Sequence, residues 1–183
     1  MSGMALGARL KPGETLGDRV IKVDHAGEHG AVCIYRAQRW FAQFRAPEMV
    51  PELDHFLTHE RGHRARFRDE LARRGQRRCR SYVWCGVGGF VLGAVTGVAG
   101  RNAIAATTVA IERVVLRHMQ EQVEELTGLD YEAVRALREI IVEEQEHHDI
   151  SVARLPRRGV WPAIIDPAVS ASTTVVIWLG MRL

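Results

Sequence analysis

Glu144-Gln145-Glu146-His147 is the stretch that decides the fold. A glutamate and a histidine three residues apart on a helix lie about one turn from each other, so both side chains project from the same face. Glu60-Arg61-Gly62-His63 repeats this spacing. A further glutamate precedes each pair by 32 residues, Glu28 in the first half and Glu112 in the second. The chain therefore carries one pattern twice, offset by 84 residues.

The doubled pattern predicts a metal centre. A single pair of this kind would mean little, because it usually lies on a solvated helix face. Two pairs, each preceded at the same distance by a glutamate among apolar residues, predict four helices that present ligands to one centre. One glutamate from each of two helices, with a Glu-x-x-His pair from each of the other two, is the ligand set of ferritin-like di-iron and di-manganese bundles. The predicted metal ligands are Glu28, Glu60, His63, Glu112, Glu144 and His147.

The predicted fold class is all-α: a ferritin-like four-helix bundle with an apolar crossover helix and a short C-terminal helix. A length of 183 residues suits one domain. We expect a flexible N-terminus over residues 1–13 and a single domain over residues 14–183. The helices are expected to begin after four points: a cap at Thr15 or Asp18, the prolines of residues 46–51, a cap at Asn102, and Asp130. Pro162 and Pro167 are expected to delay the last helix to residues 170–183.

The predicted crossover, about residues 81–100, is unusually apolar. Residues 82–100 contain no charge and six glycines. They are long enough for a marginal transmembrane helix, but the glycines lower their hydrophobicity. A bundle of this topology also needs a connection of about 30 Å between its two halves, and a helix of about 20 residues has this length. Arginines between residues 73 and 80 favour contact with lipid, so we expect a protein that lies on the membrane. The alternative is a dimer interface. The C-terminal tail is too short to span and either extends this apolar surface or joins the core.

Composition limits the other functions. The net charge is +3, and 25 residues are Lys or Arg, of which only Lys11 and Lys22 are lysines. An arginine bias of this kind is more typical of a GC-rich genome than of a binding surface, so we expect no nucleic-acid partner. The three cysteines, Cys33, Cys79 and Cys85, are expected to be free thiols in a reducing compartment. The start of the chain lacks the features of a signal peptide, so we expect a bacterial cytoplasmic chain or a processed form.

The predicted ligand set also indicates its chemistry. Glu112 lies in an apolar run and needs a partner, because burying an unpaired carboxylate costs several kcal/mol. Hard oxygen donors with few nitrogens suit Fe(II) or Mn(II) and leave coordination positions open, so activation of O2 is the expected reaction. Two further residues are expected to support the centre without binding metal. Asp24 is expected to hold a ligand imidazole, and His118 roughly shares the ligand face.

The chain resembles the demethoxyubiquinone hydroxylase family (3-demethoxyubiquinol 3-hydroxylases) of ubiquinone biosynthesis. The resemblance covers nearly the whole chain from about residue 15. It is carried by Val23-Asp-His-Ala-Gly-Glu28, Glu60-Arg-Gly-His63, Val109-Ala-Ile-Glu112, residues 143–150 and residues 178–183. His118 matches a family histidine near the iron site, whereas Met119 stands where a tyrosine is expected.

The resemblance implies two irons on the six ligands above, and a membrane-dissolved polyprenyl quinol hydroxylated with O2 and electrons that can come from NADH. With the apolar crossover, we expect a peripheral protein at the cytoplasmic face of the bacterial inner membrane. Mitochondrial relatives in the family work with a lipid-binding partner protein. A homo-oligomer would be another way to cover the apolar surface. Two rival functions share the ligands: a ferritin-like iron-storage or ferroxidase protein, which needs a soluble cage, and a di-iron oxygenase with another substrate.

Overall fold

The structure is a computed structural model that describes residues 6–156 and 160–183. Within those residues all regular elements are helices and no strand occurs. They are α1 (Leu16–Arg45), the short 3-10 helix η1 (Pro47–Met49), α2 (Val50–Arg73), α3 (Tyr82–Ala99), α4 (Arg101–Leu126), α5 (Tyr131–Arg154) and α6 (Val160–Gly180).

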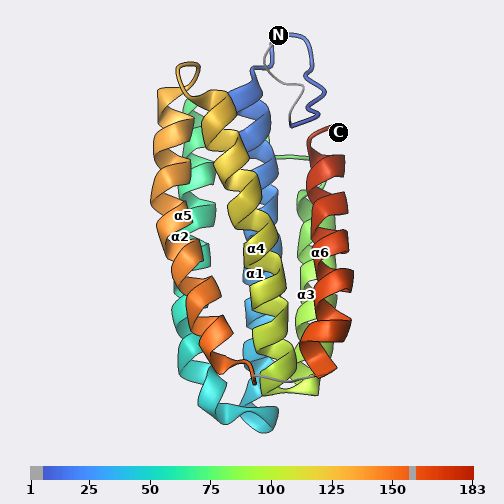
Figure 1. The fold of residues 1–183 in the computed structure, drawn as a ribbon. Coiled ribbons are helices and arrows are strands. Elements are labelled where there is room, and N and C mark those ends of the chain that lie inside the picture. Colours follow the sequence, from blue (N-terminus) through green and yellow to red (C-terminus); the bar gives the residue numbers. More distant parts are fainter. Residues whose placement is uncertain (1–5, 157–159) are drawn as a thin grey trace.

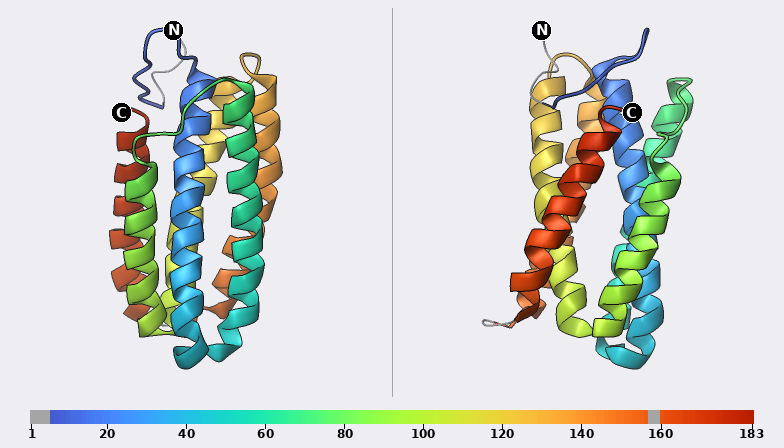
Figure 2. Two further views of the ribbon diagram at one scale, coloured as in Figure 1. Left: turned by 180° about the vertical axis from the view of Figure 1, so that it is seen from behind. Right: turned by 90° about the vertical axis from the view of Figure 1, so that its right-hand side faces the viewer.

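Helices α1, α2, α4 and α5 form the four-helix bundle, and α3 and α6 flank it on one side (Figure 1). Helix α3 packs along α1 and α6 packs along α4. Two further views show α3 running beside α1 toward the end of the bundle where α2 begins, so that α4 starts at the same end as α2 (Figure 2). The predicted all-α bundle with a helical crossover is confirmed.

Local signals explain most helix ends. Thr15 and Asp18 form a reciprocal capping box, with both side chain to backbone distances at 3.1 Å. Asp130 caps α5 by accepting a hydrogen bond from the backbone N–H of Ala133. The expected cap at Asn102 is wrong. The cap lies two residues earlier, at Gly100, whose φ of 92° is a left-handed conformation that suits glycine and turns the chain sharply out of α3.

Glycines in α3 allow it to lie directly on α1. A Cβ atom at Gly89 would lie 2.3 Å from the carbonyl oxygen of Gly30, and one at Gly93 would lie 2.3 Å from that of Ile34. No side chain fits at either position, so the glycine content of the crossover follows from its close packing. Gly30 itself lies against the backbone of Cys85, whereas Gly27 has open space beside it.

The prediction of a short, delayed C-terminal helix is wrong, because α6 has 21 residues and begins at Val160. Pro162 lies in the first turn, where a missing N–H has no helical partner to lose, and Pro167 is accommodated inside the helix. The buried side chains of Ile165 and Val169 hold this early part of α6 against α4. The packing therefore outweighs the helix-breaking tendency of the two prolines.

The bundle core has two apolar layers, one on each side of a belt of buried polar residues. One layer includes Ile21, Phe67 and Leu137, and the other includes Leu53 and Phe56. The first layer also receives Leu6, and the nearby backbone N–H of Arg9 donates to the carbonyl oxygen of Met181. The described part of the N-terminal segment is thus attached to the bundle, while residues 1–5 of the segment predicted to be flexible lie outside the described residues.

The three cysteines are free thiols, as predicted.

Candidate metal centre

The structure brings all six predicted ligand residues into one buried cluster. Each is less than 5% exposed. Their oxygen and nitrogen atoms form two groups, each with its atoms within 4.8 Å of one another: Glu28, Glu60, His63 and Glu144, and Glu60, Glu112, Glu144 and His147. Glu60 and Glu144 belong to both groups. Beside these two shared carboxylates, each group has one histidine and one further glutamate.

The inner ring nitrogens of both histidines face this cluster. Nδ1 of His63 lies 3.1 Å from Oε1 of Glu144 and 3.6 Å from Oε2 of Glu28. Nδ1 of His147 lies 3.3 Å from Oε2 of Glu144 and 3.4 Å from Oε1 of Glu60. The 32-residue spacing in the sequence therefore places equivalent residues of the two halves around one centre.

Several of the inner atoms are buried without a hydrogen bond among the described residues. They are both carboxylate oxygens of Glu60, Oε2 of Glu144, and Nδ1 of His63 and of His147. Buried polar atoms are nearly always satisfied, because an unsatisfied one costs about 1–3 kcal/mol. A pair of divalent cations would bind these converging oxygens and nitrogens and so supply the partners that they lack. The residues therefore fit a two-metal site, and their clustered carboxylates and imidazoles could hold a metal.

The electrostatics of the metal-free cluster agree with this fit. Burial, and then the charges of neighbouring glutamates, raise the pKa of Glu28 and of Glu112 well above ordinary values. Burial opposes the charging of the imidazoles, but the contacts with Glu144 and other carboxylates outweigh it and raise the pKa of His63 to about 12 and of His147 to about 9. Protons thus balance the carboxylate charge in the absence of metal, and metal binding would release them.

The outer nitrogens of the two imidazoles have different partners. Nε2 of His63 lies 2.8 Å from Oε2 of Glu143, and Nε2 of His147 lies 3.1 Å from Nδ1 of His59. Asp24 was expected to contact a ligand imidazole, but its Oδ1 accepts a hydrogen bond from Nε2 of Gln122 at 2.9 Å. The carboxylate behind His63 is therefore Glu143. Sequence reasoning indicated that such a group should exist but assigned the role to Asp24 of α1, because helical spacing alone does not show which acid faces the outer side of the ring.

A buried tyrosine also belongs to the cluster. The hydroxyl of Tyr35 donates a hydrogen bond of 2.7 Å to Oε1 of Glu112. Sequence reasoning missed this residue, although Tyr35 lies seven residues, or about two turns, after Glu28 and so shares its face of α1. It places a phenol at the centre even though Met119 stands where the family resemblance leads one to expect a tyrosine.

A cavity of about 300 Å³ joins the cluster to the surface between α3 and α6. Its inner end is lined by the four ligand glutamates, and exposed residues such as Trp84 of α3 and Val176 of α6 line its outer part. Asp24 and His118 also line it. Burial, and then the charge of Arg117, lower the pKa of His118 to about 4, so this imidazole is neutral at pH 7.

The fold and the cluster define a class: this is a ferritin-like helical bundle with a carboxylate and histidine site that can hold two metals and that opens into a largely apolar cavity. The comparisons with known proteins narrow the class to a family. The profile described as "Ubiquinone biosynthesis protein COQ7" matches residues 15–180. The chain belongs to the COQ7 family.

Similar proteins from bacteria and eukaryotes carry hydroxylase names. The 3-demethoxyubiquinol 3-hydroxylase of Rhodospirillum rubrum is 34% identical over 166 residues, which cover 90% of this chain and 77% of that protein. The human mitochondrial NADPH-dependent 3-demethoxyubiquinone 3-hydroxylase is 32% identical, with 91% of this chain and 77% of the human protein covered. The mitochondrial 5-demethoxyubiquinone hydroxylase of Saccharomyces cerevisiae is 30% identical, with 91% and 78% covered.

Proposed function

We propose that this chain is an O2-dependent di-iron monooxygenase that hydroxylates the ring of a polyprenyl demethoxy-benzoquinol in ubiquinone biosynthesis, as a 3-demethoxyubiquinol 3-hydroxylase. The observation that carries the proposal is the cavity, which leads from an apolar surface to the four glutamates of the cluster. An enzyme that oxidises a lipid-like substrate needs such a path, whereas iron storage does not. Membership of the COQ7 family supports the same reaction.

In this proposal two irons are held by the six clustered residues. Glu28 with His63, and Glu112 with His147, would hold the irons together with Glu60 and Glu144, which belong to both groups of ligands. Carboxylate oxygens dominate this set, which suits iron in its reduced state. When bound and reduced, an iron pair would supply electrons to O2, so that one oxygen atom would replace a hydrogen of the substrate ring and the other would leave as water. The chain positions the ligands, with Glu143 and His59 behind the imidazoles and Tyr35 behind Glu112.

The substrate ring would occupy the inner end of the cavity. A volume of about 300 Å³ lies at the lower end of the usual range for ligand pockets, enough for a substituted ring whose tail continues outward. Asp24 has one buried oxygen, Oδ2, without a hydrogen bond among the described residues. Burial raises the pKa of Asp24 to about 7, although the hydrogen bond from Gln122 opposes the shift. Asp24 can therefore accept a hydrogen bond, or a proton, from a ring hydroxyl near neutral pH.

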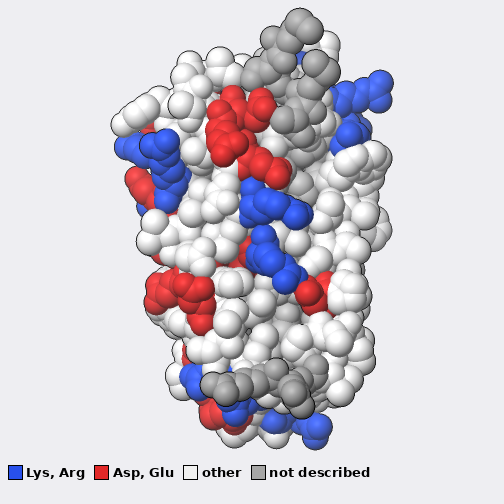
Figure 3. Space-filling view, viewed as in Figure 1, with Lys and Arg blue, Asp and Glu red and all other residues white. Residues whose placement is uncertain are grey.

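The tail of the substrate would leave through an apolar face that we define by two sets of exposed side chains. On α3 they are Val83, Trp84, Val87, Phe90, Val91, Val95 and Val98, and on α6 they are Val160, Trp161, Ile164, Val175, Val176, Trp178 and Leu179. The surface over α6 carries few charges, whereas acidic and basic residues gather over α4 and α5 (Figure 3). By length and composition alone, α3 and α6 could each cross a membrane.

We infer that this face lies on a membrane and does not span it, since α3 and α6 both pack along the bundle and their apolar residues flank the cavity. The proposed location is the cytoplasmic face of a bacterial inner membrane. A reduced nicotinamide is the proposed electron source, because several relatives are named NADPH-dependent, and either NADH or NADPH would serve. A lipid-binding partner protein or a second copy of the chain would cover part of the apolar face.

Co-sedimentation with liposomes that contain anionic lipid tests the membrane and substrate proposals together. Replacing Phe90, Val91 and Val95 of the apolar face by Gln is expected to weaken liposome binding and to slow hydroxylation of a long-tailed quinol in the liposomes. The matched control is Val142→Gln, which alters an exposed apolar residue of α5 outside the apolar face. Equal liposome binding by the triple variant and the control would contradict the membrane role.

A further inference from the structure

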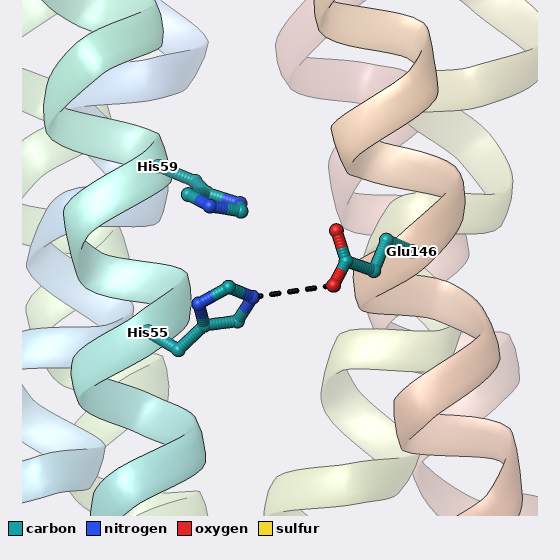
Figure 4. A group of neighbouring side chains, drawn as sticks. All are labelled: His55, His59 and Glu146. Atoms are coloured by element: carbon teal, nitrogen blue, oxygen red, sulfur yellow. Dashed lines mark ion pairs between the residues drawn. The ribbon is translucent and has the colours of Figure 1, made fainter.

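Three side chains outside the buried cluster form a second group of potential metal ligands. His55 and His59 lie four residues apart on one face of α2, and Glu146 faces them from α5 (Figure 4). Ligand atoms of the three residues lie within 4.8 Å of one another. Nε2 of His55 lies 3.4 Å from Oε1 of Glu146. The group thus bridges two helices that the chain connects only through α3 and α4.

The donor types and their spacing suit a divalent transition metal. Two histidines four residues apart on a helix can bind the same ion, and a carboxylate completes a three-ligand set that leaves positions open for water. Two imidazoles and one carboxylate are softer than the carboxylate-rich buried cluster, and they accept Fe(II), Co(II) and Zn(II) alike. A site of this composition can bind an ion and also release it.

Accessibility distinguishes this group from the buried cluster. The side chains of His55 and Glu146 are 41% and 49% exposed, and that of His59 is 23% exposed. The group lies on the α2 and α5 side of the bundle, away from α3 and α6 (Figure 1). It shares no residue with the six proposed iron ligands and none with the lining of the cavity. An ion could therefore reach it directly from water while the cavity holds a quinol.

His59 connects the two sets of ligands. Its Nδ1 lies 3.1 Å from Nε2 of His147, whose Nδ1 faces the buried cluster. The carboxylate of Glu143, 3.7 Å from Nδ1 of His59, adds negative charge at the same place and also contacts His63. An ion held by His55, His59 and Glu146 would therefore be separated from the buried centre by one layer of imidazole side chains.

We propose that His55, His59 and Glu146 form an outer site for a divalent metal ion, from which iron passes to the buried pair. The binding part of this proposal is independent of the reaction that the buried pair catalyses. The transfer part rests on the proposed function, because it takes the ion that is delivered to be iron.

Metal content of the apoprotein after dialysis against Co(II) tests the binding. Wild type is expected to hold three ions, one at each of the three groups, and His55→Ala is expected to hold two. His148→Ala is the matched control, since His148 is a histidine of α5 that contacts Asp149 instead. It should keep three ions. Equal cobalt content in wild type and His55→Ala would overturn the proposal.

A variant with a disabled buried cluster gives a second, site-specific measurement. In Glu60→Gln/Glu144→Gln, the first equivalent of Co(II) should shift the ring NMR signals of His55 and His59. The further change Glu146→Gln should weaken that binding. Signals that stay in place, or cobalt that shifts only other histidines, would overturn the outer site. If the double variant fails to fold by circular dichroism, the same spectra of wild type and His55→Ala at the third equivalent decide the question.

Loading kinetics test the transfer. Under oxygen-free conditions with limiting Fe(II), the buried pair of His55→Ala should fill several-fold more slowly than that of wild type or His148→Ala, and should reach the same final occupancy. Equal filling rates would overturn the delivery role. Chains that load normally but do not hydroxylate a quinol would contradict the proposed function and leave the outer site intact, so the two failures can be told apart.

Discussion

Glu143 holds the outer side of the His63 imidazole, with Oε2 of Glu143 2.8 Å from Nε2 of His63. On the inner side, Oε1 of the next residue, Glu144, lies 3.1 Å from Nδ1. Two successive residues of α5 therefore fix one ring of α2 from opposite sides. The ring is oriented toward the centre before any ion binds.

Replacing Glu143 by Gln should weaken metal binding at the centre. A neutral amide leaves the His63 ring less firmly oriented and its Nδ1 less basic, and groups behind metal-bound histidines are typically worth about 10–100-fold in affinity. Competition titration with Fe(II) or Co(II) measures the loss. Glu139→Gln is the control, because Glu139 lies at the surface of the same helix, α5, and pairs with Arg66 of α2. Equal affinities for the two variants would show that Glu143 does not orient the ring.

Tyr35→Phe should destabilise the metal-free protein. The change removes the donor to Oε1 of Glu112 in a fully buried position, which costs about 1–3 kcal/mol of unfolding free energy. Urea unfolding measures the difference. Tyr131→Phe alters a tyrosine that is 77% exposed and should leave stability nearly unchanged. A Tyr35→Phe protein as stable as this control would mean that Glu112 does not depend on the phenol.

Gly93→Ala and Gly88→Ala should have opposite effects on stability. A methyl group at Gly93 collides with the backbone of Ile34 and forces α3 away from α1, which should cost about 1–3 kcal/mol. At Gly88 nothing lies within 4 Å, so Ala should stabilise the helix by up to about 1 kcal/mol. The midpoints of urea unfolding give both values. Similar midpoints for the two variants would argue against the close contact between α1 and α3.

Asp24 should make the stability of the metal-free protein fall as the pH rises. Burial raises its pKa to about 7 from an ordinary value of 3.8. Below about pH 4 the carboxyl is protonated in both states and carries no penalty. As the pH rises toward 7 it ionises mainly in the unfolded state, which favours unfolding by up to about 4 kcal/mol.

Asp24→Asn cannot ionise and can still accept the hydrogen bond from Gln122. The unfolding free energy of Asp24→Asn minus that of wild type should therefore increase between pH 4 and pH 7 and level off above. Urea unfolding of both proteins across this range measures it. A constant difference would mean that Asp24 is ionised in the folded protein throughout.

The sequence predicted the bundle and the clustering of six residues because both depend on helical periodicity. A spacing of three residues fixes a shared face, and the 32-residue repeat places equivalent residues at the same height in the two halves. Contacts that depend on helix rotation or rotamers were not predictable in this way. Glu143 instead of Asp24 behind His63, and Tyr35 beside Glu112, required the structure. The length of α6 was also missed, because its packing on α4 outweighs two prolines that signal a break.

The most direct test of the account is hydroxylation of a demethoxy-benzoquinol under ¹⁸O2 by protein reconstituted with iron without oxygen. We predict two irons per chain, and a product that gains one ¹⁸O atom. Glu144→Gln should lose at least one iron and the activity with it. Full activity in Glu144→Gln, or a product oxygen that comes from water, would contradict a two-iron centre that activates O2.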